Sequence, residues 1–411
     1  KLAGKNRYHF FDTAKDTAVR GLHESIERIR QGLLNDEFVL FYQPKVNMQQ
    51  GTVIGVEALI RWQQGDQVML PPDSFLHHIE DQQLGIELGD RVIRMAMQQI
   101  AEWRSLGLQI PVSVNVSAQQ LQQPDFVASL QYSLSEFPTV IASDMEIEIL
   151  ETSALRDIEQ ITQVIRDCRK MGVKVSIDDF GTGYSSLTYL KHLRVNTLKI
   201  DQSFVRDMLI DPDDLAILEG VLGLAQAFRR TVIAEGVETE EQGKFLLDLG
   251  CYYAQGYAIA RPMPADEIPS WISQWQPPSS WLDRAVCDRN EIQIRIAAIE
   301  HKSWVANIID MLEENSDYSL LDFNACRFDS WLNGEGSRMF GNLTPYSRVE
   351  DLHRELHRHA EQLMMLKQLG KRDAMKDGIK TLLQMQEDLL ELLDLLKPAK
   401  DDSRDRASVT H

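Results

Sequence analysis

The chain has 411 residues, a hydrophobic fraction of 43% and a formal net charge of −19. Its length exceeds one average domain and indicates a large buried core beside a second module. The acidic excess argues against a nucleic-acid polymer as partner, because a polyanion would be repelled and no compensating basic patch is evident along the sequence.

Cysteine usage and hydropathy indicate a cytoplasmic protein. Cys168, Cys251, Cys287 and Cys326 have irregular spacings that do not suit a disulfide framework, which favours a reducing compartment. No stretch approaches about 18 uninterrupted apolar residues and no signal peptide is present, so we expect no membrane contact within this sequence. Because the chain starts at Lys1 without an initiator Met, we expect a fragment of a longer protein. An upstream membrane anchor in that protein stays open.

The first 36 residues precede the main domain. Residues 1–12 read as the end of a preceding domain, with a basic turn followed by a short strand. Residues 13–36 place apolar side chains three and four positions apart, which predicts an amphipathic lead-in helix.

Eight short apolar runs lie between residues 37 and 275, separated by helical stretches. This alternation favours parallel β/α architecture and predicts a closed, TIM-like (β/α)8 barrel. Each run carries a polar residue at or near its end. These residues are Gln43, Glu57, Asn115, Glu148, Asp178 with Asp179, Lys199, Glu235 and Gln255. Since such barrels place their chemistry at the carboxyl ends of the strands, we expect one site for divalent cations and a phosphorylated substrate.

The adjacent carboxylates Asp178 and Asp179 give the strongest local signal, because a glycine-containing loop follows them. Carboxylate oxygens are the ligands that Mg²⁺ and Mn²⁺ prefer, and Asp178 could bridge two ions while Asp179 binds one. So many carboxylates cannot share a pocket unneutralised, and two cations would resolve their repulsion and activate a water for displacement at phosphorus.

Taken singly, these residues allow structural alternatives. Glu57 could form a salt bridge with Arg61, and the two aspartates could cap a turn into a helix. Lys199 could form a buried ion pair with Asp201, which lies two positions on and faces the same way. Alternation alone does not decide whether Glu148 or Glu146 faces the site.

The pattern resembles the EAL family of cyclic di-GMP phosphodiesterases over about residues 20–275. The family's Glu-Ala-Leu signature corresponds to Glu57, Ala58 and Leu59. The resemblance implies hydrolysis of cyclic di-GMP to linear pGpG with two Mg²⁺ or Mn²⁺ ions per barrel. The metal ligands that it implies are Glu57, Asn115, Glu148, Asp178 and Asp179. Its catalytic residues are Glu57, Lys199, Glu235 and Gln255, and its substrate contacts are Gln43, Leu59, Arg61 and Asp201.

The resemblance also assigns Glu151 as the anchor of the loop DDFGTGYSSL (178–187), which is linked in the family to dimerisation. We therefore expect a homodimer. Leu150 departs from the family's Glu-Ile-Thr-Glu pattern, and its effect on the loop stays open although no ligand is lost. Two other functions remain as alternatives: a catalytically inactive EAL-type receptor of cyclic di-GMP, and a dimerisation scaffold. The opening residues 1–12 are similar to the last strand of a GGDEF diguanylate cyclase domain.

Beyond residue 275 the pattern changes. Residues 276–289 contain Pro and Ser and suit a linker, and residues 290–397 predict an all-α bundle. Its Leu-rich segment 381–396 should pack against another helix or chain. The polar tail 398–411 is predicted to be disordered.

His353 and His357 stand four apart on a predicted helix, a spacing that suits zinc, although a solvated helix face is the alternative. Their context resembles the chemoreceptor zinc-binding (CZB) module. That resemblance implies a zinc site made by His301, Cys326, His353 and His357, with Asp329 where the family commonly has glycine. Four protein ligands leave no open position, so zinc would regulate and not catalyse.

Overall fold

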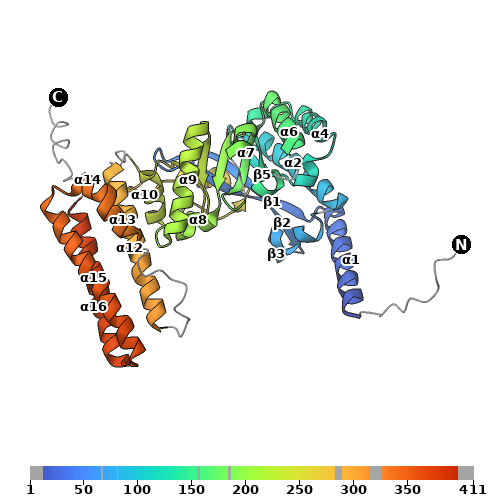
Figure 1. The fold of residues 1–411 in the computed structure, drawn as a ribbon. Coiled ribbons are helices and arrows are strands. Elements are labelled where there is room, and N and C mark those ends of the chain that lie inside the picture. Colours follow the sequence, from blue (N-terminus) through green and yellow to red (C-terminus); the bar gives the residue numbers. More distant parts are fainter. Residues whose placement is uncertain are drawn as a thin grey trace, which may run out of the picture. The chain divides into compact units, whose positions relative to one another are not determined.

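The computed structural model describes residues 13–65, 68–80, 82–154, 158–183, 187–282, 289–313 and 326–396 (Figure 1). The predicted GGDEF remnant and the predicted disordered tail lie outside the described residues. None of the helices in the described part combines the length and apolarity that crossing a membrane requires. The chain divides into two compact units. The first comprises Lys1–Gln202, Val221–Gly243 and Cys251–Asp283, and the second comprises Ser203–Gly220, Lys244–Gly250 and Arg284–His411.

Ten strands of the described chain form one sheet, and eight of them close into a ring. The ring runs β1-β9-β8-β7-β6-β5-β4-β2, and pairing between β1 and β2 closes it. The bounds are β1 Phe38–Asn47, β2 Thr52–Gln64, β3 Val68–Leu70, β4 Val112–Asn115, β5 Met145–Leu150, β6 Lys174–Phe180, β7 Thr197–Ile200, β8 Thr231–Ala234, β9 Tyr253–Ala254 and β10 Met263–Pro264. The prediction of a TIM-like barrel is therefore confirmed.

Strand β1 departs from the parallel alternation that the sequence favours, because it runs antiparallel to both β2 and β9. The four residues between Asn47 and Thr52 allow a tight turn, whereas a parallel crossover needs about a dozen residues or more. The register places Gln43 opposite Glu57. These two side chains thus meet in the middle of a hairpin and not at the carboxyl ends of two parallel strands.

The barrel strands are buried along most of their length, as expected for strands covered on both faces. All four residues of β7 and five of the six residues of β5 are buried. Val112, Ile147, Ile177 and Leu198 supply apolar core. Charged side chains within such strands are costly unless they are paired, so each of them marks a position to examine.

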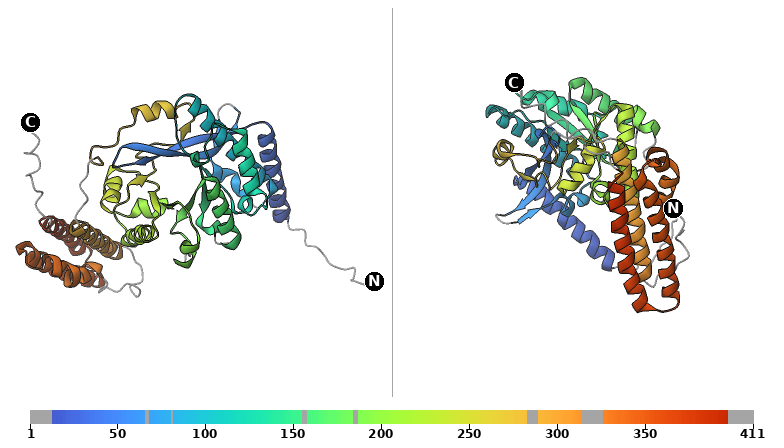
Figure 2. Two further views of the ribbon diagram at one scale, coloured as in Figure 1. Left: turned by 90° about the horizontal axis from the view of Figure 1, so that it is seen from above. Right: turned by 90° about the vertical axis from the view of Figure 1, so that its left-hand side faces the viewer.

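Helices separate the strands along the chain, and in Figure 2 several of them lie outside the strands. The bounds are α1 Thr13–Leu34, α2 Gln83–Ser105, α3 Ala118–Leu121, α4 Phe126–Glu136, α5 Glu151–Ala154, α6 Ile158–Met171, α7 Leu187–His192, α8 Gln202–Asp207, α9 Pro212–Phe228, α10 Glu240–Asp248 and α11 Ile268–Gln274, with the 3-10 helices η1 Pro72–Ser74, η2 Leu76–His78 and η3 Ala142–Asp144. The lead-in helix α1 is held by its apolar face, where Ile29 packs in one cluster with Phe38 and Trp62.

The second unit contains three long helices that lie side by side (Figures 1 and 2). They are α12 Arg289–Glu313, α15 Thr344–Gln368 and α16 Arg372–Asp394, accompanied by α13 Arg327–Trp331, the π-helical turn η5 Leu332–Gly336 and α14 Ser337–Phe340. Leu382, Leu389 and Leu393 of the Leu-rich segment are buried in a core shared with α12 and α15. This segment therefore packs against other helices of its own chain.

We expect Gly256→Ala to destabilise the barrel. A Cβ atom at Gly256 would stand 2.2 Å from the backbone nitrogen of Val237, so the backbone must shift. Such overpacking costs about 1–3 kcal/mol. Gly220→Ala is the control, because no atom lies within 4 Å of a Cβ there and Ala favours a helix interior by about 0.5–1 kcal/mol. Denaturant unfolding should place the two midpoints on opposite sides of the parent value; equal midpoints would contradict the packing.

Candidate functional site

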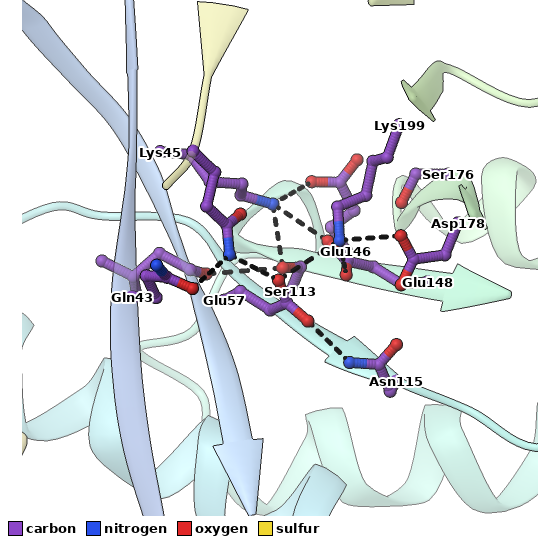
Figure 3. Close-up of polar contacts among 12 residues, drawn as sticks. Gln43, Lys45, Glu57, Ser113, Asn115, Glu146, Glu148, Ser176, Asp178 and Lys199 are labelled. Carbon is purple, nitrogen blue, oxygen red and sulfur yellow. Dashed lines mark hydrogen bonds and ion pairs between the residues drawn. The ribbon is translucent and has the colours of Figure 1, made fainter. Parts of the chain in front are cut away.

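Four acidic side chains from four strands or their ends surround the ammonium group of Lys199 in β7. Figure 3 labels three of them, Glu57, Glu148 and Asp178. The Nζ atom lies 3.2 Å from Glu57 Oε2, 2.5 Å from Glu148 Oε2, 3.0 Å from Asp178 Oδ1 and 2.6 Å from Glu235 Oε1. Lys199 and Glu148 are fully buried. The residues that the sequence predicted at separate strands thus share one centre.

Negative charge exceeds positive charge in this interior. With every carboxylate ionised, six carboxylates would face two ammonium groups, a formal excess of four negative charges. The carboxylates belong to Glu57, Glu146, Glu148, Asp178, Asp179 and Glu235, and the ammonium groups to Lys45 and Lys199. Two divalent cations carry that amount of positive charge. Ligand atoms gather as cation sites require, because Glu57, Glu148 and Asp178 form one group within 4.8 Å and Asp178, Asp179 and Glu235 form another. Asp178 belongs to both groups.

The crowding of negative charge also shifts the pKa values of these carboxyl groups. Burial, followed by the charge of Glu148, raises the pKa of Glu57, and burial raises the pKa of Asp178 and places that of Glu235 well above its usual value. Glu148 behaves differently: burial opposes its charge, but Lys199 and Lys45 outweigh burial and lower its pKa to about 2. Carboxyl groups with raised pKa values are those that bound cations would ionise fully.

Asp178 and Asp179 lie at an irregularity in the β6–β7 pairing, between Ile177 and Phe180. Asp179 adopts φ = +52°, a conformation that non-glycine residues rarely adopt. The interruption lets two consecutive side chains serve the same region although a regular strand would direct them to opposite faces. Burial and the neighbouring Asp178 and Asp201 raise the pKa of Asp179 to about 7.

Amide side chains hold Glu57 on its other sides. Gln255 Nε2 donates to Glu57 Oε2 at 2.7 Å and to Gln43 Oε1 at 2.9 Å, and Gln43 donates to the carbonyl of Ala260 at 2.9 Å. Asn115 Nδ2 donates to Glu57 Oε1 at 2.7 Å. Glu57 therefore pairs with Lys199 and two amides, and not with Arg61, whose guanidinium donates to the carbonyl of Ile60.

Lys45 is a buried cation that the sequence reasoning missed. Its Nζ atom lies 2.8 Å from Ser113 Oγ and 3.1 Å from both Glu146 Oε2 and Glu148 Oε1. Glu148 is thereby held between two lysines, and Glu146 faces only Lys45 among the lysines. This settles which glutamate faces the centre. A lysine between Pro44 and Val46 in an apolar strand was the available signal, since such a charge requires a partner.

Glu151 contacts the loop that it was expected to anchor. Its fully buried carboxylate accepts the backbone N–H of Gly181 at 2.7 Å through Oε2. A Cβ at Gly183 would stand 2.6 Å from Oε1, so a larger residue there would require the Glu151 carboxylate to move. Residues 184–186 of the loop lie outside the described residues. Leu150 is exposed at the end of β5, where it pairs in register with Asp178 of β6.

Two cavities lie beside these strand ends, and the clustered carboxylates line only the smaller one. A small one of about 180 Å³ is lined by Gln43, Glu57, Asp178, Glu235 and Gln255 among others. A larger one of about 630 Å³ has a mainly apolar lining that includes Leu59, Asn115 and Leu150. Arg61, which follows Leu59 by two residues, lies half-buried against the Phe41 ring, 5.8 Å from its centroid. Of the expected substrate residues, Gln43 lines the small cavity and Leu59 the larger one, whereas Arg61 lines neither. Asp201 hydrogen-bonds Asp179.

A second cluster lies in the helical unit, where ring nitrogens of His301, His353 and His357 gather within 4.8 Å of one another. Cys326 Sγ lies 3.6 Å from His353 Nε2. Both ring nitrogens of His301 and the Nε2 atom of His357 are buried without a hydrogen-bond partner among the described residues. Buried imidazole nitrogens normally have partners, and a zinc ion would supply one.

Burial keeps these ligands neutral. It lowers the pKa of His301 well below its usual value and that of His353 to about 3, and the nearby histidines add to both shifts. Burial raises the pKa of the Cys326 thiol to about 11. Neutral imidazole is the form that binds metal, while the thiol would have to lose its proton on binding. Asp329 does not obstruct the cluster; its Oδ1 atom lies 3.9 Å from His353 Nδ1.

Comparison with known families agrees with both sites. The EAL domain profile matches residues 26–262, and the profile of the chemoreceptor zinc-binding domain matches residues 301–364. Both resemblances seen in the sequence are thereby confirmed.

Individual relatives are similar over the barrel. The bifunctional diguanylate cyclase/cyclic di-GMP phosphodiesterase MucR of Pseudomonas aeruginosa is 37% identical over 269 residues, which are 65% of this chain and 39% of that protein. The cyclic di-GMP phosphodiesterase PdeR of Escherichia coli is 36% identical over 247 residues, 60% of this chain and 37% of PdeR. The chain therefore spans about two fifths of the length of these relatives.

Solved structures give the same family. The PaMucR phosphodiesterase in complex with c-di-GMP is 38% identical, covers 60% of this chain and 99% of its own, and aligns with a TM-score of 0.57. The EAL enzyme Bd1971, in a form bound to cAMP and cyclic di-GMP, is 31% identical with a TM-score of 0.59, covering 62% of this chain and 70% of its own.

We expect Lys45→Met to destabilise the barrel strongly, because it would leave Glu146 and Glu148 buried without this cation. Removing one partner of a buried ion pair costs about 3–5 kcal/mol. Lys170→Met, which breaks an exposed pair with Asp167, is the control and should leave the melting temperature nearly unchanged. Calorimetric melting compares the variants. Similar small shifts in both would show that Lys45 does not hold the glutamates.

Proposed function

The chain belongs to the EAL domain family, and on this premise we propose that it hydrolyses cyclic di-GMP to linear pGpG with divalent cations in the barrel. The observation that carries the proposal is that two clusters of three carboxylates share Asp178, with the ligand atoms of each cluster within 4.8 Å of one another. Relatives described as cyclic di-GMP phosphodiesterases support the substrate and the reaction.

The residues present fit two cations of the Mg²⁺ or Mn²⁺ kind. Glu57, Glu148, Asp178 and Asp179 would supply carboxylate oxygens and Asn115 its amide oxygen, and the four uncompensated charges match two such ions. When bound, these ions would lower the pKa of a water and neutralise charge on the phosphate. We take Mg²⁺ or Mn²⁺ over softer metals because the ligand set is all oxygen.

In the reaction, a water oxygen would attack phosphorus while the bond from phosphorus to the 3′ oxygen breaks. The 3′ oxygen takes a proton and leaves as the hydroxyl, and the product keeps a 5′ phosphate. We assign Lys199 and Glu235 to the water, because Glu235 lines the small cavity and its carboxylate lies 2.6 Å from Lys199. Gln255 would orient Glu57 through the 2.7 Å hydrogen bond.

The larger cavity offers room for the dinucleotide. Its volume of about 630 Å³ lies within the usual range for small-molecule sites, and its apolar lining suits a purine ring. We assign Leu59 to this ring contact and Arg61 to a phosphate, since a guanidinium pairs with phosphate through two parallel hydrogen bonds. Gln43 and Asp201 would hydrogen-bond the substrate at the rim.

We also propose that the helical unit binds zinc through His301, Cys326, His353 and His357, and that this zinc regulates the enzyme. The unpartnered ring nitrogens of His301 and His357 support the ligand set. Three imidazoles and a thiolate complete a tetrahedral site, so no position is left for a substrate. The homodimer and the cytoplasmic location inferred from the sequence remain predictions, as do the domain boundaries and the GGDEF remnant.

Glu57→Ala should lower turnover of cyclic di-GMP more than about 100-fold, because it removes one of the proposed metal ligands. Glu159→Ala, an exposed carboxylate on α6, is the matched control and should leave turnover unchanged. Appearance of pGpG is followed by chromatography with Mg²⁺ or Mn²⁺ present. Cyclic di-GMP binding by the parent chain without any pGpG would identify an inactive receptor and refute the enzyme.

The zinc assignment predicts that His353→Ala combined with His357→Ala removes most of roughly one bound zinc per chain. His359→Ala on the same helix is the control, since its Nε2 atom bonds the carbonyl of Gly378 outside the cluster. Elemental analysis after gel filtration measures the zinc. Equal zinc in the double variant and the parent would refute the ligand set.

A further inference from the structure

Basic side chains gather at the end of the barrel opposite the candidate active site. We call this region the basal cleft and define it by Thr162, Arg166, Arg169, Lys170, Lys174, His192, Arg194, Arg229 and Arg230. It consists of two hollows of about 440 and 280 Å³, and Arg169 lines both. The larger hollow lies where strands begin, because Lys174, Thr197 and Thr231 are the first residues of β6, β7 and β8.

The cleft is basic although the chain as a whole is acidic, with a net charge of −19. Glu146 is the only acidic residue lining either hollow, and Lys45 already pairs with it. Lys170 pairs with Asp167. In contrast, Arg169, Lys174, Arg194, Arg229 and Arg230 form no ion pair with any residue of the described chain. No such patch is evident along the sequence because its residues are spread over positions 162–230, and the fold brings them together.

These cations repel one another without compensation. Arg169 donates a hydrogen bond to the carbonyl of Arg194, which holds the two residues together. Partial burial, followed by the charges of Arg169 and Arg194, lowers the pKa of the Arg230 guanidinium. Charges of like sign are held close only at a cost in folding free energy, and a bound anion would recover that cost.

Unpaired hydrogen-bond donors accompany the charge. Arg230 Nε and Thr162 Oγ1 are buried and have no hydrogen-bond partner among the described residues. Thr162 lines the smaller hollow and Arg230 the larger one. A buried donor without a partner costs about 1–3 kcal/mol, so a ligand with several acceptor oxygens would satisfy both the charge and the donors.

We propose that the basal cleft binds a small soluble ligand with at least two linked phosphate groups, such as a nucleoside polyphosphate. Guanidinium groups bind phosphate oxygens through paired hydrogen bonds. Arg169 lines both hollows, with Arg166 and Arg194 beside it in one and Arg229 and Arg230 in the other, and this arrangement suits adjacent phosphates. A long polyanion is disfavoured because the rest of the chain is strongly acidic, which repels the parts of the polymer outside the cleft.

The test is calorimetric titration of the full chain with pyrophosphate, after divalent cations are removed on a chelating resin. We expect saturable binding that weakens with salt. Arg169→Glu with Arg194→Glu, both exposed, should weaken it at least about 10-fold. Arg91→Glu with Arg94→Glu, two exposed arginines of α2, are the matched control and should bind as the parent does.

Four outcomes would overturn the proposal. Absence of saturable heat, or equal binding by the Arg169→Glu/Arg194→Glu variant, removes the cleft as a site. Loss of binding in Glu57→Ala places pyrophosphate at the active site instead. Pyrophosphate could also fail to bind while flotation with phosphatidylglycerol vesicles or capture of duplex DNA depends on Arg169 and Arg194. That result would assign the surface to a lipid headgroup or a nucleic acid. Unchanged circular dichroism of each variant confirms folding.

Discussion

The ammonium group of Lys199 is the interaction on which the barrel site depends. It is fully buried and lies within 3.2 Å of carboxylate oxygens from Glu57, Glu148, Asp178 and Glu235. One positive charge cannot compensate four negative ones, so the lysine limits their repulsion without removing it. The closed ring of strands fixes the side chains against that repulsion. The negative charge that Lys199 leaves uncompensated is what allows the site to hold cations.

The two buried lysines divide the barrel interior into zones of different charge. Near the beginnings of the parallel strands, Lys45 pairs with Glu146 and one oxygen of Glu148, and this zone is close to balance. Toward the mouth, Glu57, Asp178 and Asp179 gather with few cations beside them. The hydrogen bonds of Gln255 and Asn115 position Glu57 but add no charge. Cations are therefore required at the mouth alone.

The sequence predicted which residues form the carboxylate site better than it predicted the strands and side chains that surround them. A charged side chain in an apolar strand is costly unless it is paired or binds a ligand, and this made it possible to identify Glu57, Glu148, Asp178 and Lys199. The order of the strands in the barrel then brings these residues together. The direction of β1 could not be read from the strand pattern, since apolar runs look alike in parallel and antiparallel sheets, although the short turn after Asn47 carried the information.

The basal cleft was invisible for a different reason. Its arginines come from α6, from the segment before β7 and from the segment before β8, and only the barrel brings them together. A linear search finds runs of like charge, and these positions form only the pairs Arg169–Lys170 and Arg229–Arg230. Net charge misleads in the same way, because −19 for the whole chain hides a local surplus of positive charge. Fold topology, not composition, decides where charge accumulates.

The opposite signs at the two ends of the barrel constrain the order of binding in the proposed reaction. Cyclic di-GMP is an anion, and the carboxylates beside the small cavity would repel its phosphates before cations arrive. Cations must therefore precede or accompany the dinucleotide at the mouth. The basal cleft needs no such partner, because its own cations attract phosphate directly. A phosphate-bearing ligand free of metal is thus directed to the base of the barrel, and the same ligand with metal ions bound can reach the mouth.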